Sequence, residues 1–485
     1  MSIYAGIDLG TSGIKIALVD DAGQCVAQVS RHCAVDRPHP GWSQQDPDLW
    51  WQITQALFDQ LHAEQPKLLA RLRAISLSGQ MLGPVFLDAS DRPTTPCILW
   101  NDQRSIAECK LLSDRVPDIG WRANGQPDPG FGAPKILWLA GHDPTALARA
   151  DVLMLPKDYV RLCLTGDRAT EVSDASGTML MDCATRTWDD ELLNAAGWSR
   201  DKLPDLLPSH AAAGVLREPL RQRWTIPQNV VVATGCGDNY AGALGVGASR
   251  AGQAALSIGT SGVLSAVDER FRPAPDRAVL TTPHAVPDTF LSMGVVMSAT
   301  QSLDWIANLS QSLVSDLMNG VAARLSEKGP AGFPIARPSL TGVRTPDNRP
   351  EAGAAFAGIT AVSDKYDLTY AVIEGVAFQF FDCFQAQSDS GVPITDIKAI
   401  GGGTKSHPWT QLIATLCNTT LEVPENGDIA ACLGAAKLAK ASLNPSDVME
   451  ILGRSPTILS HAAPQREWSD VLMARHQHYR ALPFQ

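Results

Sequence analysis

Alternating apolar and polar residues at the start of the chain predict a small β-meander. An apolar run over residues 3–8 leads into a Gly-Thr-Ser-Gly turn, and apolar side chains then recur at every second position over residues 14–18. This period of two is typical of a strand that buries one face. A turn at residues 21–23 leads to a third alternating segment at residues 25–29. We therefore expect an antiparallel hairpin followed by a third strand, with a glycine loop at the first bend.

The same arrangement recurs in the second half of the chain. The Gly-Thr-Ser-Gly of residues 10–13 reappears at residues 259–262, again between two apolar runs, at a distance of about half of the 485 residues. Such a repeat is far longer than the ~20–50-residue periods of solenoids. We therefore expect two related domains that face one another, residues 1–243 and residues 244–485, with the boundary in a cluster of small residues at 242–247.

Between these strands, the spacing of apolar residues predicts helices. Asp46 is a candidate N-cap, Pro47 suits the first helical position, and apolar residues recur at helical spacing from Leu49 onward. A chain of 485 residues with interspersed strands and helices is too long for one core and is typical of an α/β protein. The other helices are expected over residues 134–140, 367–386 and 407–417, and the other strands over residues 74–78, 230–234 and 397–400.

The composition argues against several classes of function. The net charge of −11 disfavours a broad nucleic-acid surface, because such surfaces neutralise many phosphates with Lys and Arg. The 10 cysteines form no C-x-x-C pair and no zinc-type spacing with histidine, which favours reduced thiols. The N-terminus has no basic region before its first apolar run, and no apolar stretch reaches ~18 residues. We therefore expect a cytoplasmic protein that binds neither nucleic acid nor membranes.

The two Gly-Thr-Ser-Gly turns are candidate phosphate-binding loops. The sequence has no G-x-x-x-x-G-K-[ST] loop, so backbone donors elsewhere must hold any phosphate. Glycine lacks the Cβ that keeps an anion away from the backbone N–H groups, and the Thr and Ser hydroxyls add donors. One such turn alone is an ordinary feature, but two in matching contexts could clamp a nucleotide from opposite sides. Their candidate residues are Gly10, Thr11 and Ser12 in the first half, and Gly259, Thr260 and Ser261 in the second.

Two aspartates and a third glycine loop are further candidates. Asp8 ends the strand before the first loop, where its carboxylate could hold Mg²⁺ against nucleotide phosphates or could stabilise the turn. Asp238 follows the apolar run at 230–233 and lies among glycines, which suits either a general base in an interdomain cleft or a structural loop. Three glycines at 401–403 stand between a strand and a helix, where bare backbone could meet a nucleotide or could form a plain connection.

Several short motifs carry a family resemblance. They are Trp-Ser-Gln-Gln-Asp-Pro at 42–47, Ile-Leu-Trp-Asn-Asp at 98–102, Leu-Pro-Lys-Asp-Tyr at 155–159, Ser-Asp-Ala-Ser-Gly-Thr at 173–178, Gly-Asp-Asn at 237–239, Ala-Ala-Phe-Ala-Gly-Ile at 354–359 and Ala-Val-Ile-Glu-Gly at 371–375. With them the chain resembles the FGGY carbohydrate kinases, and within that family it is most similar to the xylulokinases. The resemblance extends over residues 3–438.

This resemblance implies two ribonuclease H-like domains around a central cleft, of the actin and hexokinase type. It implies ATP- and Mg²⁺-dependent phosphorylation of a small sugar, with D-xylulose as the first candidate, and it is compatible with a homodimer. Asp238 would be the catalytic base, Asp8 would support Mg²⁺, and both Gly-Thr-Ser-Gly loops would hold phosphates. The nucleoside would meet Gly401, Gly402 and Gly403, and the sugar would meet Gln80, Met81, Leu82, Trp100, Asp102, Asp238 and Asn239.

Three positions depart from the xylulokinase pattern. The usual Gln-Met-His-Gly is Gln-Met-Leu-Gly here, so Leu82 replaces a sugar-binding histidine. A buried hydroxyl that loses its partner costs about 1–3 kcal/mol, which makes another pentulose, a deoxy-ketose or a polyol the alternative substrate. Val343 and Gly132 also replace more usual residues, with no evident physical consequence. Outside the enzymes, the alternative is a non-catalytic, nucleotide-dependent switch, which Asp238, Trp100 and Asp102 argue against.

Overall fold

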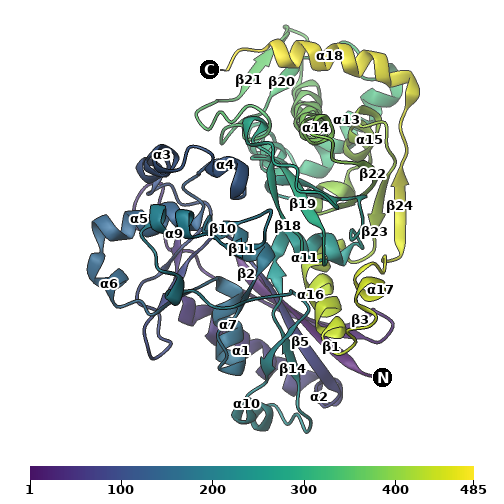
Figure 1. Ribbon diagram of the computed structural model, residues 1–485. Helices are drawn as coiled ribbons and strands as arrows, with labels where there is room; N and C mark the ends of the chain where they lie inside the picture. The colour runs from purple at the N-terminus through teal and green to yellow at the C-terminus, as the bar shows by residue number, and fades with distance from the viewer. Residues whose placement is uncertain (485) are drawn as a thin grey trace.

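The computed structural model describes residues 1–484, which form two lobes, each built on a 7-stranded sheet (Figure 1). The N-terminal sheet lies in the lower half of Figure 1 and the C-terminal sheet in the upper half, beneath helix α18 (Ser469–Ala481). Helices cover both sheets. The expected α/β class is therefore confirmed.

The N-terminal sheet begins with the meander that the sequence pattern predicts. Strand β1 (Ile3–Leu9) pairs antiparallel with β2 (Gly13–Asp20), and β2 pairs antiparallel with β3 (Cys25–His32). On its other side, β1 pairs parallel with β5 (Leu72–Gly79), which pairs parallel with β14 (Val231–Ala233). The edge strand is β13 (Ala212–Val215), and the short β15 (Cys236–Gly237) extends the end of β5.

The C-terminal sheet repeats this topology, which explains the repeated loop sequence. Strand β16 (Gly252–Ile258) pairs antiparallel with β17 (Gly262–Asp268), and β17 pairs antiparallel with β19 (Phe290–Val296). On its other side, β16 pairs parallel with β22 (Ile394–Ile400), which pairs parallel with β23 (Leu421–Pro424). The edges are β18 (Leu280–Pro283) and β24 (Ile458–Ala462). The predicted duplication is thus present strand by strand from β1–β3 to β16–β19.

Two helices lie between the sheets. Helix α11 (Asp238–Gly245) contacts β16, and α16 (Ala430–Ala441) contacts β1, β5 and α11 (Figure 1). Their backbones meet closely, because a Cβ at Gly434 would fall on the backbone oxygen of Ala241 and one at Gly245 would fall on that of Ala430. Helix α16, from the second half of the chain, therefore packs against the sheet of the N-terminal lobe.

The outer faces carry the other long helices. Helix α1 (Pro47–Glu64) has Asp46 as its N-cap, whose side chain accepts a hydrogen bond from the backbone of Asp48, as the sequence predicts. Helix α14 (Lys365–Asp389) begins with a capping box formed by Asp364 and Asp367, and it packs on β17 and β19. Helix α15 (His407–Leu416) packs on α14.

Several of the remaining elements form a separate apolar cluster that extends the N-terminal lobe. Those of the first half are β4 (Gln44–Gln45), α2 (Pro66–Leu69), β6 (Val85–Leu87), β7 (Cys97–Ile98), α3 (Ile106–Arg115), α4 (Ile119–Arg122), α5 (Gly132–His142), α6 (Pro144–Ala148), β8 (Val152–Met154), α7 (Pro156–Thr165), β9 (Thr170–Glu171), α8 (Val172–Ala175), η1 (Ser176–Thr178), β10 (Met181–Asp182), β11 (Thr187–Trp188), α9 (Asp190–Ala196), η2 (Arg200–Lys202), β12 (Leu206–Leu207) and α10 (Glu218–Arg223). Those of the second half are η3 (Pro275–Arg277), α12 (Thr300–Leu309), α13 (Val314–Lys328), β20 (Ile335–Arg337), β21 (Ala355–Ala357), η4 (Gly402–Lys405), η5 (Gly427–Ile429), α17 (Val448–Leu452) and η6 (Arg466–Trp468).

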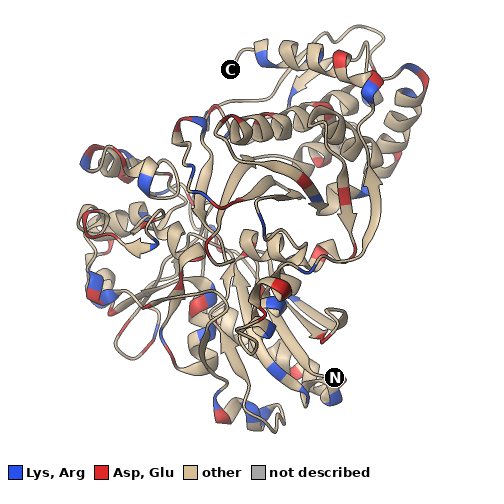
Figure 2. Cartoon of the chain, turned by 45° about the vertical axis from the view of Figure 1, so that its right-hand side comes forward, with Lys and Arg blue, Asp and Glu red and all other residues tan. Residues whose placement is uncertain are grey.

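Charged residues of both signs are interspersed along the chain in both lobes (Figure 2). Within residues 1–484, none of the helices combines the length and the apolarity needed to cross a membrane.

Candidate functional site

Asp8 lies near the end of β1, where the chain turns into the first glycine loop. Its Oδ1 accepts a hydrogen bond of 2.7 Å from the hydroxyl of Ser78 on the neighbouring strand β5. Burial raises the pKa of this carboxyl, and the Ser78 hydrogen bond and the charge of Lys15 oppose the rise. No cluster of three or more acidic, His or Cys side chains suited to a metal occurs in the described chain. A lone carboxylate beside a candidate phosphate-binding loop fits Mg²⁺, which takes most of its ligands from phosphates and water.

Asp238 is the first residue of helix α11, directly after the short strand β15. Burial raises its pKa to about 7, and the negative charge of Asp8 adds to the rise. The backbone N–H of Asn239 donates to its Oδ1 at 2.8 Å. The carboxylate borders a cavity of about 200 Å³ that is also lined by Ser257 and Val263, the residues just outside the second glycine loop. Asp238 therefore lies where the two halves of the chain meet.

The first glycine loop is joined by hydrogen bonds to residues expected to bind sugar. The hydroxyl of Thr11 donates to Oε1 of Gln80 at 3.0 Å and accepts from the indole N–H of Trp100, also at 3.0 Å. Gln45 completes this network, because its Nε2 donates to the backbone oxygen of Thr11 at 2.8 Å and its Oε1 accepts from Gln80 at 2.7 Å. Ser12 is exposed at the tip of the loop.

The second and third glycine loops lie against one another. In the second loop, the backbone oxygens of Gly259 and Thr260 accept hydrogen bonds of 2.8 Å from the start of helix α12, and the N–H of Gly259 donates to the backbone oxygen of Ser261 at 3.0 Å. The side chain of Thr260 is exposed. In the third loop, Gly401 has a φ of +93°, and a Cβ there would lie 2.6 Å from the backbone oxygen of Ile258. Only glycine suits that conformation and that approach. Gly402 is exposed, and a Cβ there would meet nothing within 4 Å.

Met81, Leu82 and Asn239 form one side of the expected sugar site. The amide Nδ2 of Asn239 lies 3.8 Å from the sulfur of Met81, so β5 and α11 meet here. Leu82 has a φ of +73°, an uncommon backbone conformation for a branched residue. Its side chain lies against Gly177, where an added Cβ would be 2.6 Å from the Leu82 Cδ2. The apolar side chain is thus packed against Gly177, at the position where the xylulokinase resemblance predicts a histidine.

Asp102 has a different environment from the one the sequence suggests. Its side chain is fully buried, and both carboxylate oxygens accept hydrogen bonds from Arg104, at 2.9 Å and 2.8 Å. The backbone N–H of Ser43 also donates to Oδ2, at 2.5 Å. Asp102 therefore fixes the loop that carries Trp100, and its expected contact with a sugar stays a prediction.

The structure thus brings the candidate residues together in two groups. Asp8, Thr11, Gln80 and Trp100 form the first group, and Asp238 adjoins it through Asp8. The loops at 259–261 and 401–403 form the second group. The cavity beside Asp238 extends between the halves, from Asn239 on one wall to Ser257 on the other. The roles of these residues stay predictions.

Sequence reasoning missed several residues that support the site. Gln45 lies within one of the recognised motifs, but its role as a bridge between Thr11 and Gln80 depends on the fold. Lys135 is buried beneath the Leu82 loop, and its Nζ donates to the backbone oxygen of Leu82 at 3.2 Å. Burial lowers its pKa to about 8. Lys135 directly follows Pro134 near a helix start, which in the sequence indicates the helix but not a place beside the candidate site.

A buried ionic cluster lies behind Asp238 and was also not predicted. The ammonium of Lys157 is 2.8 Å from Asp158, 3.7 Å from Glu171 and 3.4 Å from Asp174. Burial raises the pKa of Asp174 well above its usual value, and the negative charge of Asp238 adds to that rise. All members are buried and therefore need partners of opposite charge, and all of them except Glu171 lie in the motifs at 155–159 and 173–178.

Comparison with known proteins identifies relatives of the whole chain. Residues 3–245 match the model of the FGGY family of carbohydrate kinases, N-terminal domain, and residues 254–443 match that of the C-terminal domain. Xylulose kinase of Escherichia coli (strain K12) is 40% identical over 95% of this chain and 94% of its own, and xylulose kinase of Klebsiella pneumoniae is 39% identical over 96% and 97%. A crystal structure described as a xyloylose kinase from Brucella ovis superposes with a TM-score of 0.95 at 38% identity, covering 99% of this chain and 98% of that one.

Proposed function

This chain belongs to the FGGY family of carbohydrate kinases, and we propose that it transfers the γ-phosphoryl group of ATP to D-xylulose, giving D-xylulose 5-phosphate. Relatives named xylulose kinase, aligned over nearly the full length of both chains, support this choice of sugar. The observation that carries the chemistry is Asp238, a carboxylate at the cavity between the lobes whose pKa burial raises to about 7. A base with this pKa is well matched to proton transfer near neutral pH.

Asp238 acts as the general base in the proposed reaction. Its carboxylate accepts the proton of the terminal sugar hydroxyl, the hydroxyl oxygen forms a bond to the γ-phosphorus, and the bond from that phosphorus to the β–γ bridging oxygen breaks. The products are the sugar phosphate and ADP. Phosphoryl transfer has a loose transition state, so the protein contributes mainly position and charge. The hydrogen bond from the backbone of Asn239 fixes the carboxylate for this role.

The glycine loops hold the nucleotide in this proposal. Gly10, Thr11 and Ser12 contact the phosphates from one lobe and Gly259, Thr260 and Ser261 from the other, while Gly401, Gly402 and Gly403 meet the nucleoside. Asp8 holds Mg²⁺, since its second oxygen accepts no hydrogen bond from residues 1–484. When bound, Mg²⁺ supplies the positive charge that offsets the phosphates.

The sugar lies between β5, α11 and the Trp100 loop. Gln80, Met81, Leu82 and Asn239 contact it directly. Trp100 is 38% exposed, which leaves a ring face free to cover the sugar while its N–H stays on Thr11. Asp102 contributes by holding the Trp100 loop, because Arg104 and Ser43 occupy its oxygens.

A second candidate substrate follows from Leu82. Its packed apolar side chain offers no hydrogen bond where the family's xylulokinases have histidine, so a deoxy-ketose, another pentulose or a polyol would lose less here than D-xylulose. A hydroxyl left unpaired on burial costs about 1–3 kcal/mol, or roughly 5–150-fold in kcat/KM.

A coupled ADP-release assay over a panel of sugars tests both candidates. With Mg²⁺ present, D-xylulose should give the highest kcat/KM among pentuloses, tetritols and deoxy-ketoses. A deoxy-ketose or polyol preferred by more than about tenfold would replace D-xylulose as substrate. ATP hydrolysis that proceeds at the same rate without any sugar would contradict the kinase and favour a nucleotide-dependent switch.

Three further features belong to this proposal. The two functional units are residues 1–243 and residues 244–485, with the sugar held mostly by the first and ATP mostly by the second. The protein works in the cytoplasm, where ATP is supplied. It assembles as a homodimer, which the mass measured by light scattering would test against 51.9 kDa for one chain.

A further inference from the structure

Lys135 is a fully buried lysine that forms no ion pair among residues 1–484. It is the fourth residue of α5, and its ammonium lies beneath the Leu82 loop. A charge enters a protein interior at a high cost in lost hydration, which a partner of opposite charge normally offsets. A buried ammonium without such a partner, next to a candidate binding site, therefore points to a functional role.

The charged groups near Lys135 are engaged with other partners. Asp102 pairs with Arg104 at 2.8 Å, and Asp128 pairs with an arginine of the C-terminal lobe at 3.2 Å. Burial lowers the pKa of Lys135 to about 8, and the positive charge of Arg104 adds to the decrease. Cys97, Asp102 and Asp128 oppose this decrease. Lys135 is therefore charged at pH 7 and loses its charge as the pH rises through about 8.

The Lys135 ammonium joins two segments of the chain through their backbone oxygens. It donates to the oxygen of Leu82 at 3.2 Å and to that of Gly130 at 2.5 Å. Leu82 lies just after β5, whereas Gly130 lies in the turn before α5. One side chain thus fixes the distance between these two segments.

Gly130 in turn supports Trp100. A Cβ at Gly130 would fall on the backbone oxygen of Trp100, so the two backbones lie in contact. The N–H of Gly130 donates to Oδ1 of Asp128 at 2.9 Å, which holds the turn in shape. Because Gly130 and Trp100 are in contact, a shift of this turn would also move Trp100, whose ring covers the sugar in the proposed function.

Leu82 requires support because of its backbone conformation. A φ of +73° is unfavourable for a branched residue and persists only where the surrounding structure holds it. Gly177 packs against the Leu82 side chain, and the hydrogen bond from Lys135 holds its carbonyl group. Loss of the ammonium would free this peptide group and alter one wall of the expected sugar site.

We propose that Lys135 is a positioning residue for the sugar, which holds Leu82 and, through Gly130, Trp100 at a fixed separation. This role rests on the proposed function, in which Leu82 and Trp100 contact the sugar. An ammonium forms stronger hydrogen bonds than a neutral amine. Sugar binding should therefore weaken as Lys135 loses its proton, whereas ATP, which meets other loops, should bind as before.

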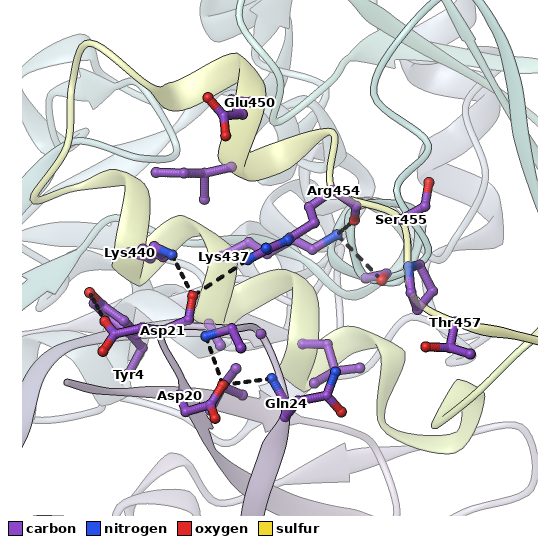
Figure 3. Close-up of a pocket in the computed structure, with 18 residues that line it drawn as sticks. Tyr4, Asp20, Asp21, Gln24, Lys437, Lys440, Glu450, Arg454, Ser455 and Thr457 are labelled. Carbon is purple, nitrogen blue, oxygen red and sulfur yellow. Dashed lines mark hydrogen bonds between the residues drawn. The ribbon is translucent and has the colours of Figure 1, made fainter. Parts of the chain in front are cut away.

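Lys437 offers a matched comparison away from the sugar. It lines a cavity of about 690 Å³ between the β2–β3 turn and helices α16 and α17 (Figure 3). Its ammonium also donates to backbone oxygens, those of Leu244 at 2.6 Å, Gly245 at 3.4 Å and Arg454 at 2.5 Å. Burial lowers its pKa to about 7. Lys437 thus holds the end of α11 opposite to Asp238, so its loss should reduce stability but not change the contacts with the sugar.

Steady-state kinetics of the wild type, Lys135→Met and Lys437→Met with D-xylulose and ATP test this role. Lys135→Met keeps the length of the side chain and removes two charge-assisted hydrogen bonds. It should raise the KM for D-xylulose at least about tenfold, while the KM for ATP stays within about threefold. Lys437→Met, the control, should keep both KM values of the wild type.

The pH dependence is a second measurement, which does not require a variant to fold. The KM of the wild type for D-xylulose should rise at least about threefold from pH 7 to pH 9.5, with a midpoint near pH 8, while the KM for ATP stays constant. Lys437→Met should show the same rise, and Lys135→Met should not.

Three results would overturn this role. The first is a KM for D-xylulose in Lys135→Met within about threefold of the wild type, and the second is an equal rise in the KM for ATP, which would indicate general damage. The third is a wild-type KM for D-xylulose that stays constant from pH 7 to pH 9.5. A wild type that does not phosphorylate D-xylulose would refute the proposed function, and this role with it, before any variant is compared.

Discussion

His284 should make the protein lose stability as the pH falls. This residue follows strand β18, is 3% exposed and lies 6.0 Å from the ring of Tyr240 on helix α11. Its Nε2 faces the backbone oxygen of Ala248 at 3.3 Å, so that nitrogen carries the proton, while the buried Nδ1 has no hydrogen-bond partner among residues 1–484. Burial lowers the pKa of His284 from 6.5 to about 4, and the Ala248 hydrogen bond opposes this only in part. The folded state therefore holds His284 neutral where the unfolded chain would protonate it.

The sign and size of the effect follow from these pKa values. Between pH 6.5 and about 4, the unfolded state binds more protons than the folded state, so the free energy of unfolding falls as the pH falls. Above the unfolded pKa the contribution is absent, and below the folded pKa the loss is complete. At ~1.36 kcal/mol per pKa unit, about 2 kcal/mol should be lost on going from pH 7.5 to pH 5, and about 3 kcal/mol in full.

Urea unfolding of the wild type and His284→Gln, followed by tryptophan fluorescence, measures this loss. Glutamine does not titrate, so the stability difference between the two proteins should shift by about 2 kcal/mol in favour of the variant from pH 7.5 to pH 5. His407→Gln, an exposed position at the start of α15, is the control and should keep the acid sensitivity of the wild type. A difference between wild type and His284→Gln that stays constant to within about 0.5 kcal/mol would refute the reasoning.

Three further predictions concern the site and the contact between the lobes. Asp238→Asn should lower kcat at least about 100-fold while the KM for ATP stays within threefold, and near-normal turnover in the ADP-release assay would remove it from the role of base. Gly434→Val should prevent α16 from packing on Ala241, and should therefore lower Tm or abolish soluble expression. The control Gly141→Ala, whose added Cβ meets nothing within 4 Å, should do neither. A Tm of Gly434→Val equal to that of the wild type would contradict the close contact. Gly401→Ala should raise the KM for ATP at least about tenfold and leave the KM for the sugar unchanged, because the φ of +93° and the approach to β16 require glycine. A rise in the KM for the sugar alone would show that this loop does not bind the nucleotide.

Local patterns in the sequence were sufficient to predict much of the fold. The meander from β1 to β3 follows from period-two alternation, and the start of α1 follows from Asp46 and Pro47, because both signals arise within a few residues. The repeated Gly-Thr-Ser-Gly correctly indicated a second copy of the same strand arrangement around β16 and β17. The resemblance to FGGY carbohydrate kinases is confirmed by family models that match both halves.

Contacts between distant segments could not be predicted in this way. Gln45 forms hydrogen bonds with Thr11 and Gln80, which lie in two other segments of the chain. The residue pattern within each segment does not indicate that the three meet. Asp102 carries the charge of a sugar ligand, but its burial against Arg104 depends on how the loop folds back on Ser43. The sequence reports which groups are available, whereas the fold decides which of them are already occupied.

The contact of α16 with the first sheet has a consequence for how the chain matures on the ribosome. Strand β1 is among the first segments to emerge, yet the helix that covers one of its faces begins only at Ala430, well after α11 ends at Gly245. At ~5–20 residues per second, synthesis of the stretch from Gly245 to Ala430 takes on the order of 10–40 s. During that interval the apolar face of the nascent sheet stays uncovered, so the N-terminal lobe reaches its final packing only after α16 has been synthesised.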